Sequence, residues 1–160
     1  MKNATGVDKM KTMKNVSIDI ETESLNPSKI HCIVAKDITT SEVKVWDHTN
    51  LETFKPWAST VDNFIMHNGV SFDAPILNRL LNTNIKLKQV IDTLILSQLF
   101  NPIRDGGHSL SAWGERLGHP KGEQEDFSTY TKEMLEYCKN DVDVTEILYK
   151  QLSLEKGNFS

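Results

Sequence analysis

The alternation of apolar and polar residues predicts three strands in the first third of the chain. Apolar residues occupy every second position of "VSIDIE" (16–21), and similar short runs follow in "IHCIVAKDI" (30–38) and "EVKVWD" (42–47). The intervening segments, "TESLNPSK" and "TTS", contain Asn, Pro and Ser, which favour turns. Because short connections join antiparallel neighbours, we expect these three strands to be antiparallel.

Strand and helix patterns alternate in the rest of the chain. A fourth strand is predicted in "NFIMHN" (63–68), and a fifth at the start of "QVIDTLILSQLF" (89–100), which continues as a helix capped near Asp92. The other predicted helices cover 51–60, 73–82, 109–118 and 131–156. Strands that alternate with helices form sheets covered on both faces, so the predicted fold is α/β, a five-stranded mixed sheet flanked by helices.

Composition indicates one domain. The chain has 160 residues, of which 38% are hydrophobic, and this suffices for one substantial core. Residues 1–14 are polar and aperiodic, so we expect a disordered tail before a single domain at 15–160. The chain contains no run of about 20 apolar residues that would span a membrane and no signal-peptide pattern, so we expect a cytoplasmic protein. Cys32 and Cys138 have no CxxC spacing and are interpreted as reduced, packed thiols.

Two carboxylates, those of Asp19 and Glu21, fall on one face of the first predicted strand. Successive strand side chains point to opposite faces, so Val16, Ile18 and Ile20 share the other face. A lone acidic pair of this kind most often belongs to the solvated face of an edge strand. The net charge of -4 does not indicate nucleic-acid binding, although acids that hold cations would mask such binding.

Two further acids favour a site over a solvated face. Asp141 lies in a mostly apolar stripe of the last predicted helix, one turn after Tyr137, where an unpaired carboxylate would be costly. Asp73 follows the fourth strand across a short loop, 69–72, and begins a helix, where an aspartate alone is most often an N-cap. Together the four acids form an oxygen-ligand set suited to Mg²⁺ or Mn²⁺. Two such ions stabilise the attacking and leaving oxygens of phosphoryl transfer, so the expected substrates are phosphodiesters.

Three motifs of the chain resemble those of the DEDD superfamily of 3'-5' exonucleases. They read "DIETESL", "HNGVSFDAPIL" and "YCKND", in the order and at the spacing of that superfamily. Tyr137 stands four residues before Asp141, as in the tyrosine branch, and Glu136 occupies the position of the histidine in another branch. The segments "VIDTLILSQLF" and "HSLSAWGERLGHPKGE" are similar to the proofreading exonuclease domains of bacteriophage family A DNA polymerases, and the resemblance spans 15–152.

The resemblance implies a ribonuclease H-like fold and a site for two divalent cations, Mg²⁺ or Mn²⁺. Asp19, Glu21 and Asp141 would hold one metal and its nucleophilic water, while Asp19 and Asp73 would serve the second metal, directly or through waters. Tyr137 would orient the attacking water. A free phenol, with a pKa of about 10, is a poor general base, so deprotonation is expected from the metal.

Four more residues match substrate-binding positions of the same family. Thr22 would lie near the terminal 3'-hydroxyl and Leu25 against the terminal base, while Asn68 and Phe72 match the polar and aromatic positions of the second motif. For Phe72 a core position is an equally good interpretation. The implied reaction releases nucleoside 5'-monophosphates from DNA 3' ends, preferably single-stranded or frayed. We expect a monomer whose partner is a DNA polymerase, either separately encoded or covalently attached.

Two alternatives stay open. Members of the tyrosine branch also process RNA, and small changes near Thr22 and Leu25 would admit or exclude a 2'-hydroxyl, so the protein could be a 3'-5' exoribonuclease. A catalytically silent domain that docks a polymerase is the other alternative. A domain that has lost its catalytic activity normally lacks one of the metal-binding acids, and all four acids are present in this chain.

Several other residues have both a structural and a functional interpretation. Trp113 and Leu117 are predicted to be core residues. His108 with Ser109 forms either a loop contact to DNA or a helix start, and His67 either touches a phosphate or is satisfied by its neighbours.

Overall fold

The computed structural model describes residues 12–120 and 126–157. Most of the predicted N-terminal tail, 1–11, lies outside the described residues. Within the described part, the backbone N–H of Lys14 donates to Oδ2 of Asp62 at 2.6 Å, and the Lys14 carbonyl accepts hydrogen bonds from the backbone of Asp62 and Asn63. The ordered fold therefore includes Lys14, the residue before the predicted domain boundary.

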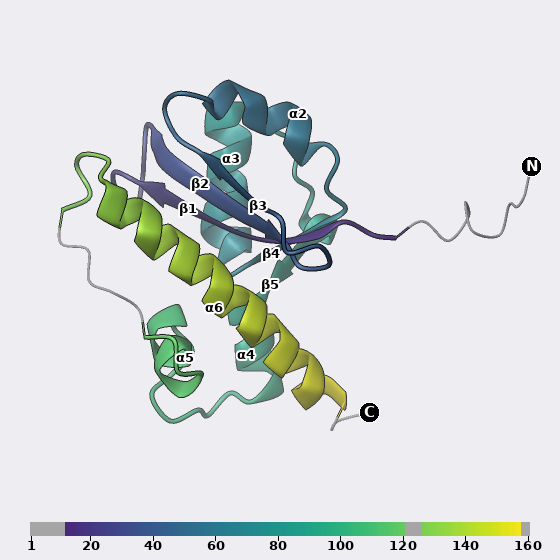
Figure 1. Cartoon of the computed structure of the whole chain (residues 1–160). Coiled ribbons are helices and arrows are strands. Elements are labelled where there is room, and N and C mark those ends of the chain that lie inside the picture. Colours follow the sequence, from purple (N-terminus) through teal and green to yellow (C-terminus); the bar gives the residue numbers. More distant parts are fainter. Residues whose placement is uncertain (1–11, 121–125, 158–160) are drawn as a thin grey trace, which may run out of the picture.

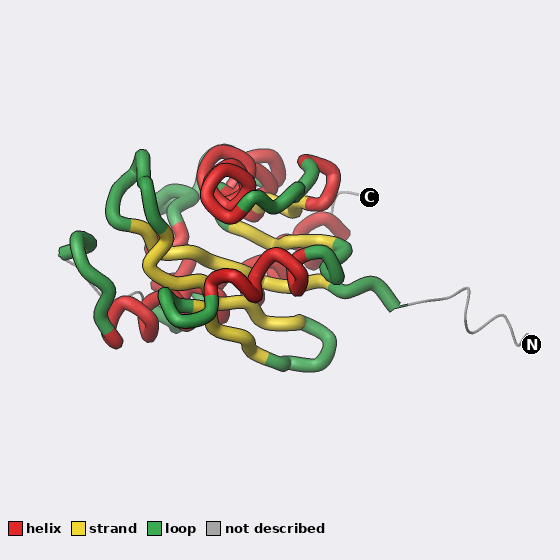
Figure 2. The backbone as a smooth tube through the Cα atoms, turned by 90° about the horizontal axis from the view of Figure 1, so that it is seen from above, coloured by secondary structure: helices red, strands yellow, loops and turns green. Residues whose placement is uncertain are grey.

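Five strands form one sheet, as predicted. They are β1 (Asn15–Thr22), β2 (Ile30–Asp37), β3 (Val43–Trp46), β4 (Asn63–Met66) and β5 (Val90–Asp92), in the order β3-β2-β1-β4-β5. The pairs β1/β2 and β2/β3 are antiparallel, which confirms the predicted arrangement of the first three strands, while β1/β4 and β4/β5 are parallel. The first strand is thus the centre of a mixed sheet. Figure 2 shows the strands in yellow, seen from above.

Helices cover both faces of this sheet (Figure 1). They are α2 (Phe54–Ala58), α3 (Ala74–Leu81), α4 (Thr93–Phe100), α5 (Leu110–Arg116) and α6 (Lys132–Gly157), with short 3-10 turns at Leu51–Thr53 and Leu87–Gln89 and a π-helical turn at Gly69–Asp73. The long helix α6 crosses one face, and α2 and α3 lie on the opposite one. The helices α4 and α5 pack beside α6. No helix within the described ranges is both long enough and apolar enough to cross a membrane.

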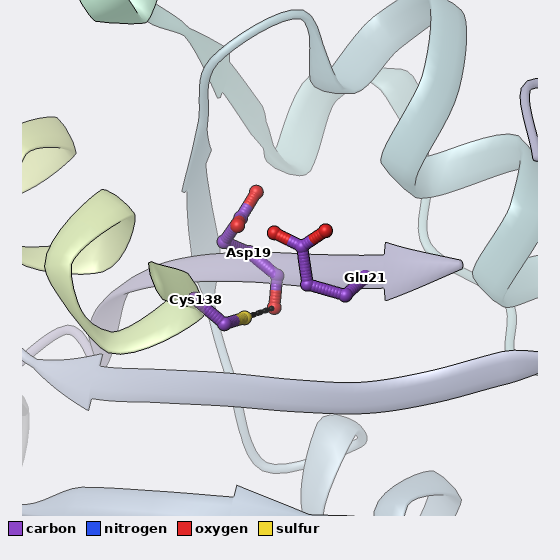
Figure 3. Close-up of side chains that lie close together, drawn as sticks. All are labelled: Asp19, Glu21 and Cys138. Atoms are coloured by element: carbon purple, nitrogen blue, oxygen red, sulfur yellow. Dashed lines mark hydrogen bonds between the residues drawn. The ribbon is translucent and has the colours of Figure 1, made fainter. Parts of the chain in front are cut away.

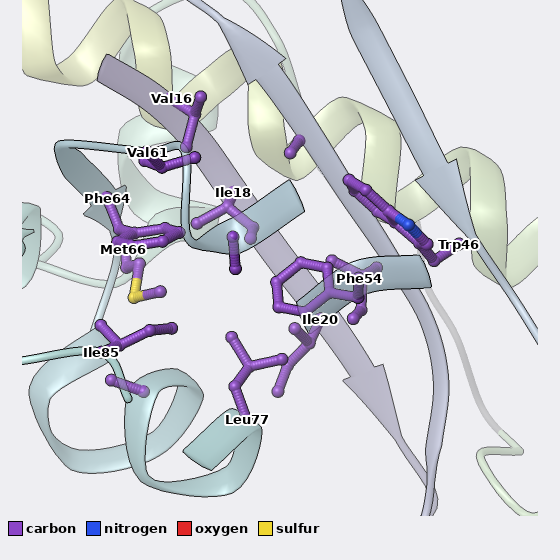
Figure 4. Close-up of a cluster of buried hydrophobic side chains, with 14 of the residues drawn as sticks. Val16, Ile18, Ile20, Trp46, Phe54, Val61, Phe64, Met66, Leu77 and Ile85 are labelled. Carbon is purple, nitrogen blue, oxygen red and sulfur yellow. The ribbon is translucent and has the colours of Figure 1, made fainter. Parts of the chain in front are cut away.

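The two faces of β1 have different roles. Val16, Ile18 and Ile20 are buried on the side of α2 and α3, where they pack with Phe54 and Leu77 (Figure 4). Burying an aliphatic side chain of this size contributes about 1.5–3 kcal/mol, so this cluster provides much of the core. The other face of β1 is turned toward α6, and its residues are Ser17, Asp19 and Glu21.

A separate cluster around Trp113 joins α4, α5 and α6. Trp113 is buried and its Nε1 donates to Oγ of Ser97 at 2.9 Å, while Leu117 packs against the same cluster, so both predicted core positions are confirmed. Nδ1 of His108 shares a 2.7 Å hydrogen bond with Oγ of Ser97, and Ser109 caps α5 by accepting from the backbone of Ala112. His108 and Ser109 therefore fit the helix-start interpretation.

Candidate active site

The strand β1 carries two acids on the face that meets α6. Side-chain atoms of Asp19, Glu21 and Cys138 lie within 4.8 Å of one another, and Figure 3 shows both carboxylates projecting from the same side of the strand. Asp19 and Glu21 are half-buried. Because β1 is the central strand of the sheet, the solvated edge-strand interpretation of this acidic pair is wrong.

Two hydrogen bonds hold α6 against this face and bracket Asp141. Oγ of Ser17 donates to the carbonyl of Val142 at 2.7 Å, and the thiol of Cys138 donates to the carbonyl of Asp19 at 3.4 Å. Asp141 is only 2% exposed, as its place in the apolar stripe suggested. The contributions of Ser17 and Cys138 were not predicted. The sequence indicated such a contact only through Ser17, a small polar residue on the same strand face as Asp19 and Glu21.

Both cysteines are buried and neither forms a disulfide, which agrees with the prediction of packed thiols. Burial raises the pKa of the Cys138 thiol well above its usual range, and a hydrogen bond with Cys32 and the charge of Asp19 add to the increase. The thiol therefore remains protonated and acts as a hydrogen-bond donor.

Asp73 reaches the same region from the π-helical turn. Asp73 directly precedes α3 and therefore occupies the N-cap position, but its side chain makes no capping hydrogen bond, so a capping role alone does not explain this aspartate. Residues 69–72 are likewise not a simple loop, since the turn Gly69–Asp73 is π-helical, a geometry that recurs at functional sites. A Cβ atom on Gly69 would overlap Met66, so this tight turn requires glycine at its first position.

Asp92 anchors that turn. Its Oδ1 accepts from the backbone of Leu94 at 3.0 Å, which confirms the predicted cap of α4. The same oxygen accepts from the backbone of Asn68 at 2.9 Å, and Oδ2 accepts from Val70 at 3.0 Å. One carboxylate thus joins the start of α4 to the turn that carries Asp73, a second role that local sequence did not indicate.

The four predicted acids converge on one cavity of about 230 Å³. Its lining consists of Asp19, Ile20, Glu21, His67, Asn68, Phe72, Asp73, Leu110 and Asp141. The acids come from β1, the π-helical turn and α6, which are separated by many residues in sequence. Leu110 was not predicted, and its contribution follows only from the way α5 packs.

Tyr137 is not part of this lining. It is half-buried on α6, one turn before Asp141, and its hydroxyl makes no hydrogen bond to any residue that the structure describes. His67 lines the cavity, and its Nδ1 shares a hydrogen bond of 2.9 Å with Oγ1 of Thr93, as expected for a residue satisfied by neighbours.

The electrostatics of the cavity fit a cation. Burial raises the pKa of Asp73 well above its usual range, and the negative charges of Glu21 and Asp92 raise it further. Among the described residues, Oδ2 of Asp73 is buried without a hydrogen-bond partner. A divalent cation would both supply that missing partner and neutralise the crowded carboxylates, so the residues present fit a hard metal ion.

A second cavity of about 250 Å³ adjoins the first. Both are lined by Ile20, Glu21 and Phe72, and the second also includes Thr22, Glu23, Ser24, Leu25 and Phe127. Leu25 is 89% exposed, whereas Thr22 is buried and donates its hydroxyl proton to the carbonyl of Ser24 at 2.8 Å. Phe72 packs partly against the core, as its core interpretation predicted, and it also lines both cavities.

The chain matches the family model of the 3'-5' exonuclease domain of family A DNA polymerases over residues 4–156. It therefore belongs to this 3'-5' exonuclease family. The DNA-directed DNA polymerase of Escherichia phage T7 is 30% identical to it over 88% of the chain, and that of Enterobacteria phage T3 is 29% identical over the same share. The chain spans about a quarter of these relatives, 27% of each.

Comparison with solved structures supports the predicted fold. The structure of Brucella melitensis NrnC bound to pGG has a TM-score of 0.68 and 22% sequence identity, and the match covers 92% of this chain and 75% of that chain. The fold is therefore the predicted ribonuclease H-like one.

Proposed function

We propose that the protein is a two-metal-dependent 3'-5' exonuclease that hydrolyses phosphodiester bonds at DNA 3' ends and releases nucleoside 5'-monophosphates. The observation that carries this proposal is the convergence of four acids from three separate elements on one cavity in a member of this exonuclease family. Members of the family combine such acids with divalent cations, and oxygen-only ligand sets suit hard ions.

The four acids would bind two cations, Mg²⁺ or Mn²⁺. Asp19, Glu21 and Asp141 would hold one, and Asp19 with Asp73 would serve the other. When bound, the ions would lower the pKa of a water molecule and stabilise the charge on the leaving oxygen. Because the thiol of Cys138 donates its proton to a backbone carbonyl, the carboxylate oxygens are the available ligand atoms. Tyr137 would orient the attacking water.

The adjoining cavity would receive the terminal nucleotide. In this proposal Thr22 lies near the 3'-hydroxyl and Leu25 against the terminal base, while Asn68 and Phe72 line the path of the strand. Apolar walls favour an unpaired base, so single-stranded or frayed ends are the proposed substrates. The phage relatives are DNA polymerases, which supports a role as a proofreading module acting with a covalently attached or separate polymerase. In this proposal the protein is a monomer and acts in the cytoplasm.

A cleavage assay tests this function directly. A 5'-labelled single-stranded DNA oligomer is incubated with the protein and Mg²⁺ or Mn²⁺, beside an EDTA control. We expect a ladder that shortens from the 3' end, and we expect it to disappear with EDTA and with Asp141→Ala. Asp143→Ala is the matched control, because Asp143 lies on the same helix with its side chain half-exposed and should be dispensable.

An RNA oligomer of the same sequence separates the alternatives. Cleavage of RNA without cleavage of DNA would replace the proposed substrate by RNA. If the folded protein cleaves neither DNA nor RNA, the proposed exonuclease activity is contradicted and the polymerase-docking alternative is favoured.

A further inference from the structure

The turn that carries Asp73 lies against a buried aspartate at the end of β5. Asp92, the last residue of β5, pairs with Met66, the last residue of β4, and the π-helical turn begins three residues after Met66. Asp92 is 6% exposed. It does not line the cavity that contains the four acids, called the acid-lined cavity below. Its carboxylate is therefore buried beside the site without being part of its walls.

Both oxygens of the Asp92 carboxylate bind the segment that forms this turn. Oδ1 accepts from the backbone N–H of Asn68 at 2.9 Å, and Oδ2 accepts from that of Val70 at 3.0 Å. Oδ1 also accepts from the backbone of Leu94 at the start of α4, at 3.0 Å. Hydrogen bonds to a carboxylate are stronger than those between neutral groups. One short side chain thus fixes the beginning of the turn relative to both β5 and α4.

The backbone between Asn68 and Asp73 transmits this constraint. Asn68 has a φ of 65°, a left-handed conformation that is uncommon outside glycine and that asparagine tolerates. Its N–H is held by Asp92, and its carbonyl accepts from the backbone N–H of Phe72 at 3.0 Å. Phe72 directly precedes Asp73, so a continuous series of hydrogen bonds leads from Asp92 to the residue before Asp73.

Asp92 also acts on Asp73 through its charge. The negative charge of Asp92 contributes to the raised pKa of Asp73, and Oδ2 of Asp73 is buried without a hydrogen-bond partner among the described residues. A negative charge that opposes the ionisation of a carboxylate attracts a cation to the same place. A cation bound by Asp73 would therefore be attracted by a second carboxylate that lies outside the cavity.

We propose that Asp92 is the positioning residue for the second cation, the one that Asp19 with Asp73 would serve. This inference rests on the proposed two-metal function. The first cation depends instead on β1 and α6, which are joined by the hydrogen bonds of Ser17 and Cys138. Loss of the contacts between Asp92 and the turn should therefore weaken the binding of one cation and spare the other.

Asp92→Ser separates the two structural roles of this carboxylate. Serine is a good N-cap and should retain the hydrogen bond to α4, but its single, closer oxygen gives up the contacts with the turn. Asp92→Asn is the milder variant, because it keeps one acceptor oxygen and loses the other. Circular dichroism and urea unfolding of the metal-free variants verify that they are folded.

Asp62→Asn is the matched control. Oδ2 of Asp62 also accepts a hydrogen bond from a backbone N–H, that of Lys14 at 2.6 Å, and Asp62 lines neither of the two cavities. The substitution therefore removes a comparable carboxylate from a place where it should not influence a cation.

Manganese binding measures the effect without any cleavage. EDTA-treated protein is titrated with Mn²⁺ in the presence of a nucleoside 5'-monophosphate, the proposed product, and free Mn²⁺ is followed by electron paramagnetic resonance. We expect two bound ions in the wild type and in Asp62→Asn. In Asp92→Ser one of the two should need about 10- to 100-fold more Mn²⁺, with an intermediate increase in Asp92→Asn.

A double variant decides whether Asp92 acts through Asp73. In Asp73→Ala, which lacks a ligand of the second cation, adding Asp92→Ser should cause no further loss of Mn²⁺ binding. A further loss as large as the one in the wild-type background would overturn the inference, and so would an Asp92→Ser variant that binds both ions as tightly as the wild type.

Kinetics on single-stranded DNA provide a second readout. The kcat of Asp92→Ser should be low at limiting Mn²⁺ and should recover to nearly the wild-type value at saturating Mn²⁺, with an unchanged KM for DNA. A merely structural role would lower kcat at every Mn²⁺ concentration, which would overturn the inference. A wild type that binds two ions but cleaves no DNA would overturn the proposed function alone, because the binding titration would still decide the role of Asp92.

Discussion

Asp92 contacts two segments of the chain and is itself not part of the lining of the acid-lined cavity. It caps α4 and also binds the backbone of Asn68 and Val70, which fixes the turn that carries Asp73. Ser17 and Cys138 do the same for Asp141 by tying α6 to β1. At the scale of single residues, the acids are positioned by polar groups that would take no part in hydrolysis. Buried polar groups are usually hydrogen-bonded, and the partners of Asp92, Ser17 and Cys138 lie on the segments that carry the acids. These hydrogen bonds therefore determine the geometry of the cavity.

Tyr137 provides the sharpest test at this scale. Tyr137→Phe removes only the hydroxyl, so the reaction should slow by roughly 10- to 100-fold because the attacking water is less well oriented. Binding of Mn²⁺, measured by calorimetry, should not change. An unchanged kcat at saturating Mn²⁺ would eliminate the water-orienting role.

The element that organises the site is α6. It supplies Asp141, and it is fixed to β2 by an ion-pair network in which Glu146 lies 2.8 Å from Nζ of Lys36 and 3.0 Å from Nζ of Lys150. Burial raises the pKa of Glu146, but the hydrogen bonds from Lys36 and Lys150 lower it more, so the net pKa lies below its ordinary value. The pKa of Lys36 is raised, chiefly by the hydrogen bond to Glu146. The ionised pair is therefore favoured in the folded state.

This network predicts a pH dependence of stability. The folded-state pKa of Glu146 lies below the ordinary value of 4.5, so its contribution is fully present above that value and is lost as the pH falls through the folded-state pKa. Glu146→Gln should lower the free energy of unfolding by about 1.5–3 kcal/mol at pH 7, and by less in strong acid. Urea unfolding at several pH values measures this difference.

Glu136→Gln is the matched control for that experiment. Glu136 is on the same helix and pairs with Lys139 at 3.4 Å, but its side chain is 70% exposed. An exposed pair of this kind contributes about 0–1 kcal/mol. Equal effects of the two substitutions would contradict the anchoring role of Glu146.

The whole molecule should be stabilised by the cations that the acid-lined cavity is proposed to bind. A ligand that binds only the folded state adds about 2.7 kcal/mol at a concentration one hundred times its Kd. For a domain of this length that corresponds to a Tm increase of several degrees. Thermal unfolding of EDTA-treated protein, followed with increasing Mg²⁺ or Mn²⁺, measures the shift.

Asp19→Ala and Asp141→Ala should lose most of this shift. Without metal they should be as stable as the wild type or more stable, because removal of one carboxylate relieves repulsion in a crowded cluster. Two results would contradict the metal site: a wild-type Tm that does not respond to divalent cations, or metal-free variants that melt far earlier than the wild type.

Much of this molecule was determined by patterns that are local in the sequence. Period-two alternation placed Asp19 and Glu21 on one face of β1, and the apolar stripe of α6 indicated that Asp141 faces the protein interior. The strand and helix patterns yielded the five-stranded mixed sheet, and the order of the acids identified the exonuclease family that the family model confirms. Such features follow from sequence because periodicity alone decides which way a side chain points from its own element.

Only the tertiary structure decided what lies opposite each of these side chains. The π-helical turn that carries Asp73 was not predicted, and neither was the position of Tyr137 outside the lining of the acid-lined cavity. The contact between His31 and Phe127 spans 96 positions and depends on one extra residue in β2. A single inserted residue in a strand or turn redirects the following side chains without changing the surrounding hydrophobic pattern, so these contacts have no local sequence signal.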